Sequence, residues 1–270
     1  MSDKTKAVIH YILLFLQSLL FLLITLLLLL KFTVFNVSYV KNVLSKNDYY
    51  DNLYHEILTE MSYYTNQSGF EDDILNNIIT IGEVKFETNS FIEKVYTGKT
   101  RNIDTEALNK RLQNNIDAYI SKSSFEYVDK KEIDDFIKAI DEVYSDEIKL
   151  MGYVEKIAPL FYKLITLSSK LLIIAIVLFV ILSIINYLLY KFKNINIILL
   201  FTAFSLIFFS IYFKNNIDVK NIFIYSKLMS DIIKYIINNI MFVNTIIIII
   251  YIVIAIIPVV LKKGKKYEAI

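Results

Sequence analysis

The stretch AVIHYILLFLQSLLFLLITLLLLL, residues 7–30, holds 24 residues without a charged side chain. Three further uncharged apolar runs follow at residues 171–190, 194–213 and 235–261. An α-helix rises about 1.5 Å per residue, so roughly 20 apolar residues cross the hydrocarbon core of a bilayer. The sequence therefore predicts an integral membrane protein with four membrane-spanning helices.

The charged side chains are strongly segregated along the chain. Residues 32–157 hold 14 Lys/Arg and 23 Asp/Glu, a net charge of −9, whereas the rest holds 15 basic and 4 acidic residues, a net charge of +11. An acidic region does not neutralise phosphates, so we expect no nucleic-acid partner. The basic residues lie next to the apolar runs, where anionic lipid headgroups are their natural partners. The lipid bilayer is therefore the first predicted partner.

Basic residues at the ends of the runs predict the topology. Eight lysines fall on one side of the membrane if both termini lie there: Lys4, Lys6, Lys191, Lys193, Lys262, Lys263, Lys265 and Lys266. Lys and Arg are retained in the cytoplasm, whereas long loops are translocated largely regardless of charge. We therefore expect a multi-pass protein of the cell membrane with both termini in the cytoplasm and the acidic region outside.

These patterns divide the chain into nine segments. The predicted segments are a cytoplasmic tail (1–6), transmembrane helix one (7–31), an acidic extracytoplasmic helical domain (32–157), transmembrane helix two with an outer extension (158–190), a cytoplasmic turn (191–193), transmembrane helix three (194–213), an outer amphipathic helix or loop (214–238), transmembrane helix four (239–261) and a basic cytoplasmic tail (262–270). The helix of span two is expected to begin near Met151 and to kink at Pro159.

Apolar residues of the outer domain recur at three- and four-residue steps, which is the spacing of one helix face. Three such stripes cover residues 53–64, 108–120 and 133–148, and we expect the last two to bury each other. No long stretch alternates with period two, which argues against a sheet. The predicted fold class is all-α: a four-span transmembrane helix bundle with an extracytoplasmic helical domain between spans one and two.

Capping signals predict where these helices begin and end. Thr80 and Glu83 have the spacing of a capping box, and the helix that they open is expected to stop near Gly98. Asp104 and Asp129 are the predicted caps of the next two helices. Between residues 216 and 239, polar and apolar residues separate onto two helix faces, which predicts a helix that lies partly in the membrane interface.

Four polar side chains within or beside the apolar runs are candidate contacts between the spans: His10, Gln17, Asn186 and Asn244. His10 and Gln17 lie seven residues apart on one face of span one. Hydrogen bonds between helices, worth about 1 kcal/mol each, explain such residues in a bundle. A proton relay through His10 is the alternative.

The most concentrated acid of the outer domain lies on the helix predicted after Asp129. Its polar side is expected to carry Asp134, Asp135, Asp141, Glu142, Asp146 and Glu147. Two interpretations stay open, a solvated face that keeps the domain soluble and a surface that recruits a basic protein partner. The second makes Asp134, Asp135, Asp141 and Glu142 the candidate interaction residues.

Residues for catalysis or metal binding are sparse. The chain has no cysteine, which excludes a disulfide, a thiolate nucleophile and a zinc–thiolate site. His55 has no second outer histidine to complete a conventional zinc site, and the acids lack the loop spacing of a calcium site. No phosphate loop or dinucleotide-binding motif occurs. We therefore predict a non-enzymatic protein without a metal or cofactor.

The apolar runs contain no Asp, Glu, Lys, Arg or Gly, and Pro258 is their one helix breaker. Ion-coupled transporters usually carry buried charges and interrupted helices. Transport by a single copy is therefore not expected, whereas an oligomeric pore stays open because the sequence leaves the oligomeric state undetermined.

Two resemblances add to this interpretation. The segment from YYDNLY (residues 49–54) through Gly69 to YTGK (residues 96–99) resembles uncharacterised four-span membrane proteins of low-GC Gram-positive bacteria. The layout resembles that of mechanotransmission-type ABC permeases, which have inner termini and a large outer domain after span one. Such permeases couple to an ATPase through cytoplasmic elements, and residues 1–6 and 191–193 offer little of that kind.

The expected function follows from a folded exterior joined to spans without catalytic or transport hallmarks. We expect the outer domain to bind a partner or ligand, or to scaffold an envelope complex. A permease-like subunit or oligomeric channel is the alternative, and a membrane enzyme that acts on lipid or peptidoglycan is the third.

Overall fold

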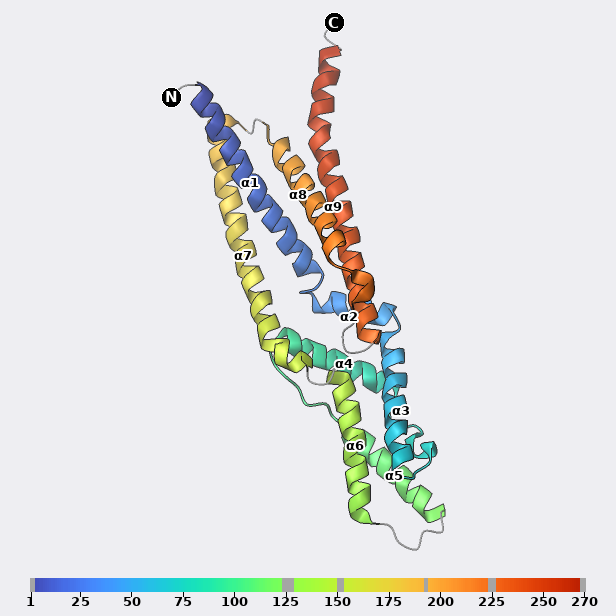
Figure 1. Ribbon diagram of the computed structural model, residues 1–270. Coiled ribbons are helices and arrows are strands. Elements are labelled where there is room, and N and C mark those ends of the chain that lie inside the picture. The colour runs from blue at the N-terminus through green and yellow to red at the C-terminus, as the bar shows by residue number, and fades with distance from the viewer. Residues whose placement is uncertain (1–2, 123–128, 150–152, 192–193, 223–226, 268–270) are drawn as a thin grey trace. The chain divides into compact units, whose positions relative to one another are not determined.

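The computed structural model of the protein describes residues 3–122, 129–149, 153–191, 194–222 and 227–267 (Figure 1). All regular elements in these ranges are helices, which confirms the all-α prediction for the described chain. The chain divides into two compact units. Of the described chain, unit 1 holds residues 3–36, 165–222 and 233–267, and unit 2 holds residues 37–164 and 227–232.

Four helices of the described chain are long and apolar enough to cross a membrane, in agreement with the four spans that the sequence predicts. They are α1 (Asp3–Phe32), α7 (Tyr153–Tyr190), α8 (Asn196–Asn216) and α9 (Lys227–Tyr267). Pro159 lies in the second turn of α7, where it removes one hydrogen bond near the helix end, and the helix continues past it. Met151, the predicted start of this helix, lies outside the described residues, as do 192–193 of the predicted turn and residues 1–2 and 268–270 of the two tails.

α1 lies between α7 and α8 in unit 1 (Figure 1). One buried cluster joins α1 to α7 and contains Ile24, Leu27, Leu172 and Ala175. A second cluster joins α8 to α9 and contains Ala203, Leu206 and Ile248. The small side chains of Ala175 and Ala203 let neighbouring helix backbones approach closely, as is usual for helices that pack in lipid.

The faces of these helices that point away from the clusters are apolar as well. Leu188 of α7 is 72% exposed and Phe208 of α8 is 76% exposed. Apolar surface of this extent favours association or aggregation in water, whereas lipid tails accommodate it. The exposure pattern of unit 1 is therefore that of a bundle surrounded by lipid.

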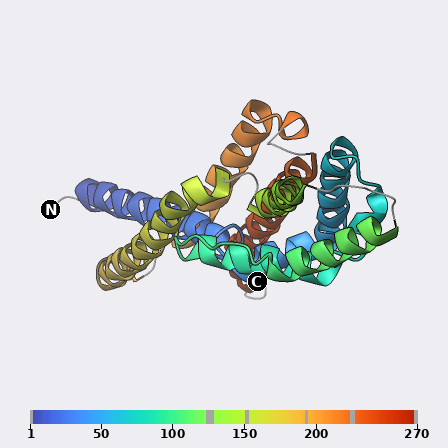
Figure 2. The same cartoon turned by 90° about the horizontal axis from the view of Figure 1, so that it is seen from below.

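Unit 2 is a set of shorter helices that pack around α6. In chain order they are α2 (Val37–Lys46), α3 (Tyr49–Gln67), η1 (Asp72–Leu75), α4 (Ile81–Tyr96), α5 (Glu106–Lys122) and α6 (Lys130–Lys149). α6 contacts α3, α4 and α5, and Figure 2 shows it nearly end-on beside α3. The core side chains are completely buried and include Ile57, Met61, Leu112, Ile116 and Ile140. The stripes of α5 and α6 thus share their core with α3 and α4.

α4 begins and ends where the capping signals predict. The Thr80 hydroxyl accepts a hydrogen bond from the Glu83 N–H, and the Glu83 carboxylate accepts one from the Thr80 N–H. Gly98 follows the helix with φ of 69°. A Cβ atom added to Gly98 would lie 3.0 Å from the Cβ of Tyr162. Both the backbone conformation and the available space therefore favour glycine.

Of the caps predicted for α5 and α6, Asp129 directly precedes its helix, whereas Asp104 lies one residue further out, before Thr105. Both carboxylates still bond to the first turn of their helices. The Asp104 carboxylate accepts a hydrogen bond from the Glu106 N–H at 3.1 Å, and that of Asp129 accepts one from the Lys131 N–H at 2.8 Å. Each carboxylate satisfies a backbone donor that has no partner within its helix, and its charge is favourable at a helix N-terminus.

The apolar stripe of α3 departs from the prediction at its end. Tyr64 is 38% exposed, whereas Thr65 is completely buried. The buried positions advance in steps of four from Leu53 through Ile57 and Met61, so the next one is residue 65. The Thr65 hydroxyl satisfies its hydrogen-bonding capacity by donating to the Met61 carbonyl at 3.0 Å.

The prediction of a helix between residues 216 and 239 is wrong for the first part of that range. Residues 217–222 hold a short 3-10 turn, η2 (Val219–Asn221), and α9 begins at Lys227; residues 223–226 lie outside the described chain. The Asp218 carboxylate accepts a hydrogen bond from the Asn221 amide at 2.7 Å. Such local side-chain bonds stabilise a turn in competition with a helix.

Ile140→Asp should lower the free energy of unfolding by about 3 kcal/mol or more, because it places an unpaired carboxylate where Ile140 is completely buried. Ile137→Asp is the matched control, since Ile137 lies one turn earlier on α6 and is half-buried. Thermal melting of the full-length protein, followed by circular dichroism, should show a clearly larger loss for Ile140→Asp. Equal losses would contradict the described packing of α6.

Candidate interaction surface and interhelical polar contacts

The four candidate acids of α6 do not share one environment. Asp134, Asp135 and Glu142 are exposed to solvent. A carboxylate oxygen of Glu142 lies 3.9 Å from the ammonium group of Lys138, one helical turn earlier. An exposed ion pair of this kind contributes less than about 1 kcal/mol to stability, so these three carboxylates are chiefly solvated.

Asp141 has a different environment from the other three acids. Its carboxylate accepts hydrogen bonds from the Thr105 hydroxyl at 3.1 Å and from the Asn109 amide at 2.8 Å. Thr105 directly precedes α5 and Asn109 lies in its first turn, so Asp141 joins α6 to the N-terminal end of α5. The prediction that Asp141 belongs to a solvated interaction surface is therefore corrected to a contact between two helices.

Glu147 was also predicted on the polar side of α6, and this is wrong. The residue is 7% exposed and lies beside Ile148, three residues after the buried Tyr144. A residue three positions after a buried one falls on the same helix face. Burial raises the pKa of Tyr49, and the carboxylates of Glu56 and Glu147 raise it further. Asp146 is exposed as predicted.

An acidic cavity of about 490 Å³ lies between the end of α3 and the beginning of α6 in unit 2. Asp129, Glu132 and Asp135 line it together with Phe70 and Phe136, whose ring centroids are 5.1 Å apart. Carboxylates beside aromatic rings suit the cationic end and the apolar stem of a Lys or Arg side chain. Of the four predicted acids, Asp135 lines this cavity.

Two ion pairs hold α4 to the following part of unit 2, and the sequence interpretation missed them. Arg111 lies 2.6 Å from the Glu83 carboxylate, and Arg101 lies 3.1 Å from that of Glu87. Burial raises the pKa of Glu83, but hydrogen bonds from Arg111 and Thr80 outweigh burial and bring it below its usual value. The four-residue spacing of the two acids places them on one face of α4, but it does not indicate which arginines lie opposite.

Gln17 of α1 is completely buried and hydrogen bonds to two residues of α7. Its Nε2 donates to the Ser183 hydroxyl at 3.1 Å, and its Oε1 accepts from the Asn186 Nδ2 at 2.7 Å. The Ser183 hydroxyl in turn donates to the Phe179 carbonyl at 2.7 Å. The structure therefore brings together two of the four candidate intramembrane residues, Gln17 and Asn186.

The other two candidates make separate contacts. His10 packs its ring against Tyr190 of α7, with 4.2 Å between centroids, and neither ring nitrogen has a hydrogen-bond partner within the described part of the chain. Its contact with α7 is therefore a ring contact instead of the expected hydrogen bond. The Asn244 Nδ2 donates to the Ser210 hydroxyl at 2.8 Å and so joins α9 to α8.

Two more polar contacts connect α1 with the remaining spans. The Thr202 hydroxyl of α8 donates to the Ser18 carbonyl at 3.4 Å. The hydroxyls of Thr25 and Tyr251, which belongs to α9, are 2.9 Å apart and share a hydrogen bond. Together with Gln17, these contacts give α1 a polar bond to each of the other three spans.

No group of three or more His, Asp or Glu residues that could hold a metal ion occurs within the described ranges. No protein-family model, curated protein or solved structure matches this chain. The resemblance to four-span proteins of low-GC Gram-positive bacteria stays a prediction.

Gln17→Leu should destabilise the full-length protein by about 1 kcal/mol, because it removes the bond to the buried Asn186 amide. Asn186→Leu should have a similar effect. The double variant should lose less unfolding free energy than the two single variants lose together, since neither amide is then left without its partner. The measurement is a double-mutant cycle of unfolding free energies in detergent.

Thr245→Val provides the control cycle, because the Thr245 hydroxyl donates to the Met241 carbonyl of its own helix. Gln17→Leu and Thr245→Val should be additive. If the effects of Gln17→Leu and Asn186→Leu on the unfolding free energy were additive as well, this would contradict an energetic link between α1 and α7 at this point.

Proposed function

We propose that this chain is a multi-pass protein of the cell membrane with both termini in the cytoplasm and residues 32–157 outside. The support is the distribution of charge: the eight lysines named above fall on one side in this topology, and the acidic region falls on the other. Four apolar helices supply the even number of crossings that the arrangement needs.

Single cysteines can test this topology directly, because the natural chain has none. We expect an impermeant maleimide to label His55→Cys on intact protoplasts and to leave Ser2→Cys and Ala269→Cys unlabelled until the membrane is opened. Positions 2 and 269 lie outside the described residues, and His55 lies on α3. Labelling of either terminus on intact protoplasts would reverse the proposed orientation.

The proposed function is non-enzymatic: unit 2 binds a basic protein partner, or scaffolds an envelope complex through such a partner. The acidic cavity of unit 2 carries this proposal, because Glu132 and Asp135 are exposed carboxylates beside two aromatic rings. A charged hydrogen bond contributes about 1.5–3 kcal/mol, and the net charge of −9 over residues 32–157 favours encounter with a cationic surface.

The structure supplies matched variants for this proposal. Glu132→Gln with Asp135→Asn removes two charges from the cavity, and Asp134→Asn with Glu142→Gln removes two exposed charges from the same helix outside it. Asp129 and Asp141 are left unchanged because their carboxylates hold α6 in place.

We expect the cavity variant to lose a protein that co-purifies with the wild type from detergent-solubilised membranes, and the control variant to retain it. Quantitative mass spectrometry of the purified samples measures the recovery. Binding of the same protein should weaken with salt, because 0.1 M salt screens charges beyond about 10 Å. Equal recovery with both variants would contradict the role of the cavity, and turnover of an envelope substrate without any partner would contradict the function.

A permease-like subunit or oligomeric channel is the second proposal. It is supported by the buried polar side chains between α1 and α7, namely Gln17, Ser183 and Asn186. Reconstitution into liposomes, with and without candidate ATPases, separates the two functions. Flux that Gln17→Leu abolishes would favour the channel over the binding protein.

A further inference from the structure

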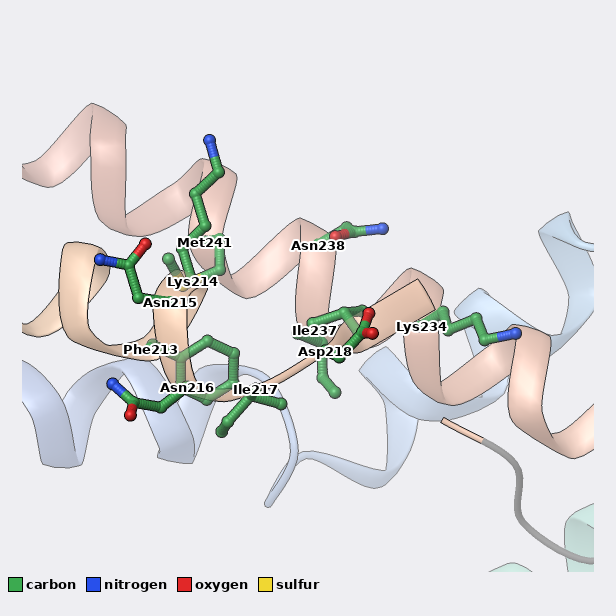
Figure 3. Close-up of a pocket in the computed structure, with 11 residues that line it drawn as sticks. Phe213, Lys214, Asn215, Asn216, Ile217, Asp218, Lys234, Ile237, Asn238 and Met241 are labelled. Carbon is green, nitrogen blue, oxygen red and sulfur yellow. The ribbon is translucent and has the colours of Figure 1, made fainter. Parts of the chain in front are cut away.

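Two adjoining cavities lie in unit 1 where α8 ends and α9 enters its apolar part. The polar cavity has a volume of about 640 Å³, and its lining includes Lys214, Asp218, Lys234 and Asn238 (Figure 3). The apolar cavity has a volume of about 510 Å³, and apolar side chains of α1, α8 and α9 line it throughout. Phe213, Ile217, Ile237 and Met241 line both cavities, so the two adjoin along these side chains.

The site crosses the boundary between apolar and polar sequence. The apolar run of α8 ends at Phe213, and Lys214, Asn215 and Asn216 follow directly. Leu29 of α1 lines the apolar cavity two residues before Lys31, the first charged residue after that run. Such boundaries lie at the level where hydrocarbon gives way to headgroups. The apolar cavity therefore faces the hydrocarbon side and the polar cavity the headgroup side.

The charged groups of the polar cavity favour an anion. Lys214 and Lys234 contribute two positive charges and Asp218 one negative charge, and Figure 3 shows the two lysines well apart in this view, with Asp218 between them. Basic pockets between membrane helices bind acidic lipid headgroups, with about 1 kcal/mol for each Lys or Arg near the surface. The amide of Asn238, which is exposed, adds a donor for phosphate oxygens.

The apolar cavity limits what can occupy it. A helix is about 10–12 Å wide, whereas this cavity is a partly open space of about 510 Å³ with an entirely apolar lining. An acyl chain is narrower than a helix and carries no polar group, so it matches this lining. We propose that this site binds one anionic phospholipid, with an acyl chain in the apolar cavity and the phosphate headgroup in the polar cavity.

This lipid site does not depend on the partner proposed for unit 2, and it can be tested with the full-length protein. The protein is reconstituted with equal amounts of phosphatidylglycerol and phosphatidylcholine, extracted in detergent, and examined for retained lipid by native mass spectrometry. The wild type should retain phosphatidylglycerol in preference to phosphatidylcholine.

Three variants separate the two parts of the site. Lys214→Gln with Lys234→Gln should lower the preference by about fivefold for each lysine, and Asp218→Asn should raise it. Ile240→Trp fills the apolar cavity and should lower retention of both lipids. The matched control is Lys110→Gln with Lys122→Gln, two exposed lysines of α5 in unit 2, which should leave retention unchanged.

Three outcomes would overturn the proposal. The first is a wild type without headgroup preference, and the second is an unchanged preference in the variant of Lys214 and Lys234. The third is a dimer without retained lipid, because a second copy would then occupy the site. Unchanged melting temperatures of the lysine and aspartate variants exclude misfolding as the cause of a loss.

Discussion

The hydrocarbon core of a bilayer offers no water, and this constraint determines how unit 1 is built. Backbone groups must bond within their helices, so the four apolar runs form long helices. Most of the few polar side chains then bond to one another or to a carbonyl, whereas His10, near the beginning of α1, makes a ring contact with α7. The side chains of Gln17 and Thr25 of α1 hydrogen bond to α7 and α9. The Thr202 hydroxyl of α8 donates to the Ser18 carbonyl of α1. α1 is thus the helix that brings the other three together.

Unit 2 follows the pattern that water favours, with apolar side chains in a core and charged side chains outside it. Its helices have one apolar face each, and ion pairs such as Arg111 with Glu83 occupy the partly exposed contacts between them. Most acids of α6 lie in solvent because water favours charged groups, whereas Glu132 and Asp135 line a cavity. The two proposed binding sites differ in the same way. The acidic cavity of unit 2 suits a basic protein, and the amphipathic cavity of unit 1 suits a phospholipid.

Local signals in the sequence predicted local structure well. The Thr80 capping box, Gly98 and the apolar stripe through Ile140 each depend on nearby residues, and the helices follow them. Contacts between helices could not be predicted in this way. Glu147 lies within the apolar stripe of α6 by a three-residue step, and the role of Asp141 depends on α5. The two cavities combine residues from distant segments, so no single pattern in the sequence indicates them.

The position of α1 is the central claim, and cross-linking of α1 to α8 in native membranes tests it most directly. Ser18→Cys and Thr202→Cys lie at a completely buried contact, whereas Phe204 on the same helix is 61% exposed. A short membrane-permeant thiol cross-linker should join Ser18→Cys to Thr202→Cys and should fail to join it to Phe204→Cys, as measured by mass spectrometry of linked peptides. Equal or reversed efficiencies would contradict the described bundle.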